Sequence, residues 1–164
     1  MMRRKLIQAL ALITITLTVA AADKPNISGT WELDKNRSFS NPAGLEQTMT
    51  IVHNGDEVKL DIRLVIQGKE TIVKETWLLD GKEYDFTPPG APPGSTGKRV
   101  ASWMPGNRGI LVTDDSTINN PKGPTKQQTM RKWTLSADGS SLIVDYFIDR
   151  PGQSFESKRV FVRK

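Results

Sequence analysis

Apolar and polar residues alternate along most of the chain after residue 29. The clearest example is residues 57–66, in which every second side chain is apolar and most of the others are charged. The apolar positions are Val58, Leu60, Ile62, Leu64 and Ile66. Because successive side chains of a β-strand point to opposite faces, this pattern predicts a strand with one buried face and one face in water.

Ten segments carry this pattern, and short clusters rich in Gly, Asp and Asn separate many of them. The predicted strands are residues 29–34, 46–53, 57–67, 70–79, 82–86, 98–104, 109–118, 125–135, 142–149 and 153–162. Asn54-Gly55, Asp80-Gly81 and Asp138-Gly139 favour tight turns, because these residues accept the positive φ that hairpin turns require. No segment after residue 22 shows a convincing helical period. The pattern predicts an all-β fold, an antiparallel meander that closes into a barrel of eight to ten strands.

Two predicted connections are longer than a hairpin turn. Residues 35–45 are rich in Ser, Asn, Pro and Gly, and we interpret them as an ordered loop across one end of the barrel. Residues 87–97 read Thr-Pro-Pro-Gly-Ala-Pro-Pro-Gly-Ser-Thr-Gly, a stiff segment that cannot pair in a sheet. We interpret it as a spacer between two strands, although it also has the composition to dock on a partner protein.

Residues 1–22 have a different pattern. Three basic residues at positions 3–5 precede an apolar stretch, residues 6–19, and the segment ends in three Ala residues. These are the marks of a secretory signal peptide, with cleavage expected after Ala22 or one residue earlier. An uncleaved anchor is the alternative, but Thr residues dilute the apolar stretch and no basic cluster follows it. We therefore expect a single domain, residues 23–164, that is periplasmic or secreted and leaves the membrane after cleavage.

The charge balance argues against a nucleic-acid partner. The chain has 23 Lys plus Arg against 18 Asp plus Glu, but three of the basic residues lie within residues 1–22. The predicted domain keeps 20 basic and 18 acidic residues, a net charge of +2, which is too small for a nucleic-acid footprint. The chain contains no Cys, which excludes disulfides and thiolate metal sites and, in an exported domain, points to a bacterial setting.

Candidate catalytic and phosphate-binding features are weak. Residues 94–98 read Gly-Ser-Thr-Gly-Lys, but Arg99 replaces the Ser or Thr of a phosphate-binding loop, and a predicted strand follows. His53 is the one imidazole, and we expect it on the surface because it ends a strand beside a polar turn. Residues 114–116, Asp-Asp-Ser, are interpreted as a solvated strand end. The sequence thus predicts no enzyme, no cofactor and no metal site.

Aromatic residues and two arginines fall on the predicted inner faces. Trp residues 31, 77, 103 and 133 lie on four different strands, Arg131 alternates with Trp133, and Arg159 alternates with Phe161. An Arg on an apolar face needs an aromatic ring or an anion beside it, and Glu75 is the one obvious inward acid. If a cavity exists, we expect Arg131 or Arg159 to meet the polar end of an amphipathic ligand. The expected ligand-binding residues are Trp77, Arg131, Trp133, Tyr146 and Arg159. Two alternatives remain, namely that each Arg lies flat on a Trp, or that both point to water.

The opening of the first strand resembles a known family. Gly29-Thr30-Trp31 after a signal peptide, together with the hairpin sequences at residues 78–83 and 133–139, is similar to small secreted bacterial lipocalin-like proteins of the calycin type. The resemblance implies an antiparallel barrel around a site for a small apolar ligand. It also implies that Gly29 and Trp31 belong to one closed barrel end, with either Arg159 or Arg163 over Trp31. The last strand reads Arg159-Val160-Phe161, so it lacks the Arg-x-Tyr pair of intracellular fatty-acid carriers.

Three functional hypotheses follow. The first is an exported lipocalin-like barrel that binds a small apolar or amphipathic ligand in its interior. The second is a structural or protein-interaction barrel with a packed interior, which uses residues 87–97 or a sheet edge. The third is an enzyme with His53 in a cleft, which the sequence does not favour. The presence of a cavity is the observation that separates the first two hypotheses. The oligomeric state is not predicted.

Overall fold

The structure, a computed structural model, describes residues 23–164. The predicted signal peptide lies outside these residues. The described chain forms ten strands: β1 (Gly29–Leu33), β2 (Glu46–Asn54), β3 (Glu57–Ile66), β4 (Lys69–Leu78), β5 (Asp80–Phe86), β6 (Thr96–Trp103), β7 (Ile110–Asn120), β8 (Gly123–Leu135), β9 (Ser141–Arg150) and β10 (Gln153–Arg163). Each of the ten predicted strands is present. The period of two reflects a buried face in strands such as β2 and β3, whereas β5 is exposed over most of its length.

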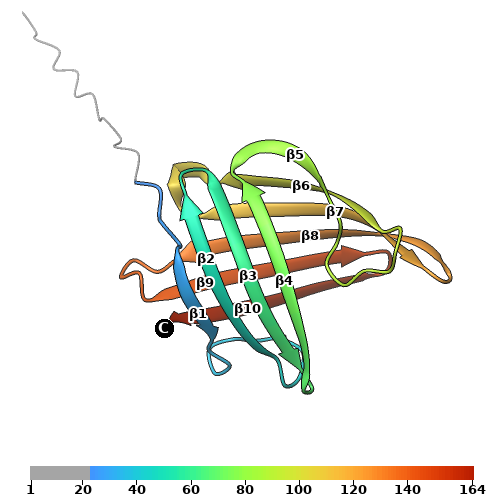
Figure 1. The fold of residues 1–164 in the computed structure, drawn as a ribbon, viewed down its shortest axis with the longest axis horizontal. Helices are drawn as coiled ribbons and strands as arrows, with labels where there is room; N and C mark the ends of the chain where they lie inside the picture. Colours follow the sequence, from blue (N-terminus) through green and yellow to red (C-terminus); the bar gives the residue numbers. More distant parts are fainter. Residues whose placement is uncertain (1–22) are drawn as a thin grey trace, which may run out of the picture.

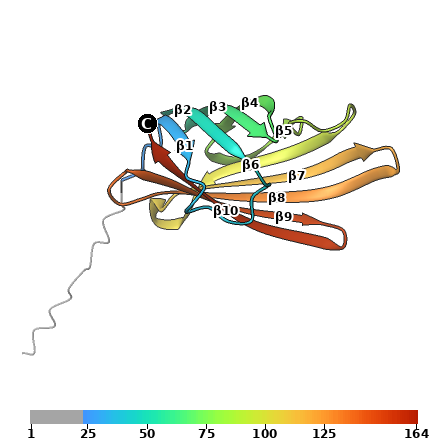
Figure 2. The ribbon, with the colours of Figure 1, turned by 90° about the horizontal axis from the view of Figure 1, so that it is seen from below.

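All ten strands belong to one antiparallel sheet with the order β4-β3-β2-β1-β10-β9-β8-β7-β6-β5. The sheet bends around its own interior, so that β2 to β4 cross in front of β6 to β10 (Figure 1). The β7–β8 hairpin extends beyond the other strands at one end (Figure 2). The predicted all-β barrel is therefore confirmed, as ten antiparallel strands in a nearly closed barrel.

The first and last strands close most of the barrel. β1 pairs with β10 from Trp31 opposite Arg163 to Leu33 opposite Phe161, so the C-terminus lies beside β1 (Figure 1). The sheet is not hydrogen-bonded between β4 and β5, which leaves one seam. Asp80-Gly81, expected as a hairpin turn, instead lies at an irregularity in the β5–β6 ladder, where Gly81 has φ 73°. Asp80-Gly81 forms no hairpin turn because β4 and β5, which flank it, do not pair with each other, and β5 pairs with β6.

The core fills one half of the barrel. Its fully buried side chains include Trp31, Trp77, Trp133 and Phe161, and they pack with aliphatic residues of β2, β3, β7 and β9. Burying this apolar surface is the main source of stability for such a fold. Within residues 23–164, helical structure is confined to one short 3-10 turn, Pro105–Asn107, and no helix is long and apolar enough to cross a membrane.

Candidate functional site

A cavity of about 550 Å³ occupies the half of the barrel that the core leaves unfilled. One wall comes from β3 and β4, where Ile62, Leu64 and Val73 present apolar side chains. The opposite wall comes from β8, β9 and β10 and presents Arg131, Tyr146 and Arg159. Pro89 and Gly90 of the Pro-rich segment also line it, so this segment contributes to the cavity. The size lies in the range of about 300–1,000 Å³ that is usual for small-molecule sites.

Arg159 is held in the cavity wall by neutral groups. Its Nε donates to Asn41 Oδ1 at 2.9 Å, and its Nη1 donates to Gln47 Oε1 at 2.8 Å. The guanidinium group lies over the ring of Tyr146, 4.4 Å from the ring centroid. No carboxylate within residues 23–164 forms an ion pair with Arg159. Its positive charge therefore faces the cavity without a matching anion.

Arg131 has a different environment, because two carboxylates neutralise it. Its Nη1 donates to Glu75 Oε2 at 3.0 Å and its Nη2 donates to Asp114 Oδ2 at 2.9 Å. Arg99 contacts the same two acids, at 2.9 Å to Glu75 and 2.6 Å to Asp114. The four side chains, which we call the buried quartet, are all at most 8% exposed and carry no net charge.

The buried quartet shifts the pKa values of two of its members. Burial alone would raise the pKa of Glu75, but the charges of Arg131 and Arg99 hold it below its ordinary value. Burial alone would lower the pKa of Arg131, but the charges of Glu75 and Asp114 raise it. Both groups are therefore ionised at neutral pH. The partner that the sequence argument assigned to a ligand carboxylate is, for Arg131, supplied by the protein itself.

Two of the expected ligand-binding residues belong to the core and do not line the cavity. Trp77 and Trp133 are fully buried, and their rings meet edge to face with 5.0 Å between centroids. Trp77 Nε1 donates to Glu75 Oε2 at 2.7 Å, which ties the core to the buried quartet. The other three expected residues, Arg131, Tyr146 and Arg159, do line the cavity.

The closed end of the barrel has the arrangement that the family resemblance implies. The Arg163 guanidinium group lies over the ring of Trp31, 4.3 Å from its centroid, so the covering arginine is Arg163 and Arg159 belongs to the cavity. Gly29 leaves room for this contact, because a Cβ atom there would collide with Arg163 Nη1. Trp31 Nε1 donates to the carbonyl oxygen of Ile27 at 3.0 Å.

His53 is buried, and the expectation of a surface position was wrong. The residue is 7% exposed, and its ring stacks on Trp103 with 5.5 Å between centroids. The segment before β1 covers it, a contact that comes from residues 26 positions away and is invisible to local pattern. Both ring nitrogens have backbone partners, Ile27 N–H and Gly55 O. The ring also borders a depression of about 280 Å³, together with Lys24, Asp56 and Trp103.

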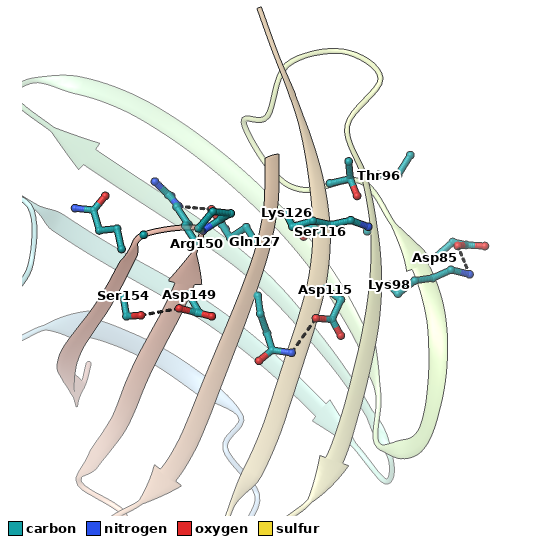
Figure 3. A pocket seen from close by; sticks show the side chains of 16 residues that line it. Asp85, Thr96, Lys98, Asp115, Ser116, Lys126, Gln127, Asp149, Arg150 and Ser154 are labelled. Carbon is teal, nitrogen blue, oxygen red and sulfur yellow. Dashed lines mark hydrogen bonds and ion pairs between the residues drawn. The ribbon is translucent and has the colours of Figure 1, made fainter. Parts of the chain in front are cut away.

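A second, larger depression of about 1010 Å³ lies over the ends of β5 to β10 and is polar (Figure 3). Several of its charged side chains have partners on a neighbouring strand. Lys98 pairs with Asp85 at 2.7 Å, and Asp115 accepts a hydrogen bond from Gln128 at 2.9 Å. Asp149 accepts one from Ser154 at 2.6 Å. Because the residues that form these pairs lie opposite one another on neighbouring strands, the row forms a cross-strand polar ladder. No group of three or more His, Asp or Glu residues in the described chain is arranged to hold a metal ion.

Sequence reasoning missed Arg99 and Asp114, although their pattern contained the signal. Arg99 alternates with Ala101 on β6, and Asp114 alternates with Val112 and Ile110 on β7, so both lie on the inner face. Asp114 was interpreted as part of a solvated strand end, whereas the structure buries it in the quartet. The neighbouring Asp115 points outward, as expected.

No protein-family model matches the sequence, and no curated protein sequence matches it. Solved structures match it in fold. Zebrafish ileal bile acid-binding protein, complexed with cholic acid, superposes with a TM-score of 0.52 and 16% identity over 84% of this chain and 98% of that one. Lipid binding protein 8 of Caenorhabditis elegans gives 0.51 and 13%, over 84% and 95%. Secretory abundant heat soluble protein 4 of Ramazzottius varieornatus gives 0.50 and 15%, over 87% and 96%. At these identities the likeness concerns the fold, which is that of calycin-type barrels.

Proposed function

We propose that this barrel binds a small amphipathic anion, with the apolar part against β3 and β4 and the anionic group at Arg159. The observation that carries the proposal is the unmatched charge of Arg159 in a cavity whose other wall is apolar. A carboxylate can take a two-pronged contact from a guanidinium group, and such charge-assisted hydrogen bonds are strong. Tyr146 and Gln47 lie beside Arg159 to complete the polar end of the site.

The fold comparisons support this proposal without specifying the ligand. Two of the similar structures are, by name, a bile acid-binding protein and a lipid binding protein. The hypothesis of a packed interaction barrel required a filled interior, and the cavity speaks against it. Catalysis by His53 is not part of the proposal, because both of its ring nitrogens are engaged by the backbone.

A displacement assay tests the site. The amphipathic anion 1-anilinonaphthalene-8-sulfonate is bound to the protein and displaced with dodecanoate or with dodecanol, which has the same chain but no charge. Replacing Arg159→Gln should weaken dodecanoate binding by about 10- to 100-fold, the value of lost charge-assisted hydrogen bonds, and should leave dodecanol binding nearly unchanged. Arg63→Gln is the matched control, because Arg63 lies on the outer side of β3 and pairs with Glu70.

Two outcomes would count against the proposal. If Arg159→Gln weakens both ligands equally, Arg159 supports the fold of the cavity and does not select an anion. If neither ligand displaces the probe from the unchanged protein, the cavity does not serve amphipathic ligands, and the interaction-barrel hypothesis leads again.

We also propose that the barrel works outside the cytoplasm, after removal of residues 1–22. The support is the basic, apolar and small-residue pattern of that segment. N-terminal sequencing of the fractionated protein should find a chain that begins at Asp23, within a residue or two. A chain that begins at Met1 and sediments with membranes would contradict export.

A further inference from the structure

The segment that precedes β1, residues 23–28, covers the closed end of the barrel. Ile27 is its one fully buried side chain, and the others are half-buried or exposed. Hydrogen bonds of two kinds link this segment to the barrel end. The side chains of Asn26 and Ser28 bond the backbone of His53, and the backbone of Ile27 and Ser28 forms three further bonds. The carbonyl of Ile27 accepts from Trp31 Nε1, that of Ser28 accepts from Arg163 Nη1 at 2.7 Å, and the Ile27 amide donates to His53.

The contact with His53 depends on the neutral form of the ring. Nδ1 accepts a hydrogen bond from the Ile27 amide at 3.3 Å, while Nε2 lies 3.1 Å from the carbonyl oxygen of Gly55. A carbonyl can only accept and an amide can only donate, so the partners require a proton on Nε2 and a lone pair on Nδ1. A second proton would sit on Nδ1 and face the Ile27 amide, placing two donors against each other.

The charged groups around the ring do not provide a free negative charge that would stabilise the protonated form of His53. Asp56, on the β2–β3 turn, is already paired with Lys24 of the covering segment at 2.8 Å and accepts from Trp103 Nε1 at 3.1 Å. Because Lys24 and Asp56 carry opposite charges close together, their fields at His53 largely cancel. Burial lowers the pKa of His53, the Gly55 carbonyl and Asp56 oppose that shift, and Lys24 adds to it.

We propose that His53 is a pH-sensitive latch that holds residues 23–28 against the closed barrel end when neutral and releases them when protonated. The segment contributes one buried side chain and no strand pairing, whereas the ladders around it run the length of the barrel. Such a segment can open while the sheet stays intact, because local openings cost less free energy than global unfolding. Release uncovers Trp31 and frees the ring of His53 to be solvated as an imidazolium.

The sign of the effect follows from the lowered pKa. The closed segment binds a proton more weakly than the released one, so closure is fully favoured above about pH 6.5, the ordinary value for His. As the pH falls from there through the pKa of the closed form, closure is progressively lost. Since His53 is the only His of the chain, its ring resonances report this titration without ambiguity.

Nuclear magnetic resonance of the full chain provides the test. The His53 ring resonances are followed from pH 8 to pH 4.5, together with hydrogen exchange of the Ile27 amide and of the Val144 amide in β9. After correction for the intrinsic pH dependence of exchange, the protection of Ile27 should fall at least 10-fold in step with His53 protonation. The protection of Val144 should not change over that step.

Variants separate the latch from its neighbours. His53→Gln can still accept from Ile27 and donate to Gly55 but cannot be protonated, so it should keep Ile27 protected at acidic pH. Lys24→Gln removes the ion pair with Asp56 and should keep the pH step, because the step belongs to His53.

Three results would overturn the latch. In the first, Ile27 stays protected while the ring titrates. In the second, Ile27 and Val144 lose protection together, as they do when the whole barrel unfolds. In the third, the pH step persists in His53→Gln or disappears in Lys24→Gln.

Discussion

Asp114 and Asp115 are adjacent in sequence and differ completely in environment. Asp114 belongs to the buried quartet, while Asp115 lies in the outer polar ladder with Gln128. Replacing Asp114→Asn should lower the free energy of unfolding by about 3–5 kcal/mol, because it leaves one guanidinium charge buried without compensation. Asp115→Asn is the matched control and should leave the midpoint of urea unfolding unchanged. Equal effects of the two substitutions would show that the quartet does not stabilise the fold.

The contribution of Glu75 to the stability of the fold depends on pH. Its pKa in the folded protein lies below its ordinary value of about 4.5, so it stabilises the fold above that pH and loses the contribution as the pH falls through its folded pKa. The melting temperature of Glu75→Gln should therefore lie well below that of the unchanged protein at pH 7, and the gap should narrow towards pH 3. Glu70→Gln, which alters an exposed pair with Arg63, should show no such narrowing. If the difference in melting temperature between Glu75→Gln and the unchanged protein stays constant from pH 7 to pH 3, ionised Glu75 does not stabilise the fold.

At the scale of elements, one glycine fixes the approach of β7 to β8. A Cβ atom on Gly109 would collide with the backbone carbonyl oxygen of Trp133, which cannot move without breaking the ladder. Gly109→Ala should therefore destabilise the protein by about 3 kcal/mol, the upper part of the usual range for overpacking. Gly139→Ala, in the β8–β9 turn, meets only open space and should cost about 1 kcal/mol for its positive φ. Thermal unfolding of the two variants compares them directly, and the reverse order would show that β7 and β8 can move apart.

Strands such as β2 and β3 were predictable from sequence because burial of one face leaves a period of two in the apolar residues. Asp114 and His53 show that the pattern does not predict which polar side chains are buried. Both obey the period of their strands, as Asp114 follows Val112 and His53 follows Ile51 on the inner face. Both residues were nevertheless interpreted as solvated, because their partners lie outside their own strand. The partners are Arg99 and Arg131 for Asp114, and Ile27 of the segment before β1 for the His53 ring. Only the register of β4, β6, β7 and β8 brings the quartet together, and register is a property of the whole sheet.

At the scale of the whole molecule, the order of strands in the sheet permits a circular permutation. A chain that starts at Asp80, runs to Lys164, continues through a short Gly-Ser linker to Asp23 and ends at Leu79 would place every strand next to its ladder partner. The linker has to reach from Lys164, whose amide donates to the carbonyl oxygen of Thr30 at 2.9 Å, to the start of the segment that precedes β1.

This permutant should fold to the same barrel and refold faster than the parent. The β1–β10 pairing becomes local in sequence, and proteins with more local contacts fold faster. Stopped-flow fluorescence of the buried Trp residues measures both rates. A permutant that refolds more slowly, or fails to fold, would show that the β4–β5 connection is needed to begin folding.

The sheet curves around the cavity and is interrupted only at the seam between its two edge strands, β4 and β5. Hydrogen bonds resist the separation of strands everywhere else around the sheet, so deformation concentrates at the one place where they are missing. The seam can therefore widen while the hydrogen-bonded strands keep their curvature. Thr71, Val73 and Glu75 of β4 also line the cavity, so a wider seam would enlarge the cavity without breaking a ladder, while the pairs of Glu75 with Arg99 and Arg131 hold the seam together. We therefore expect the seam, held by these ion pairs, to be the place where the width of the cavity adapts to a bound molecule.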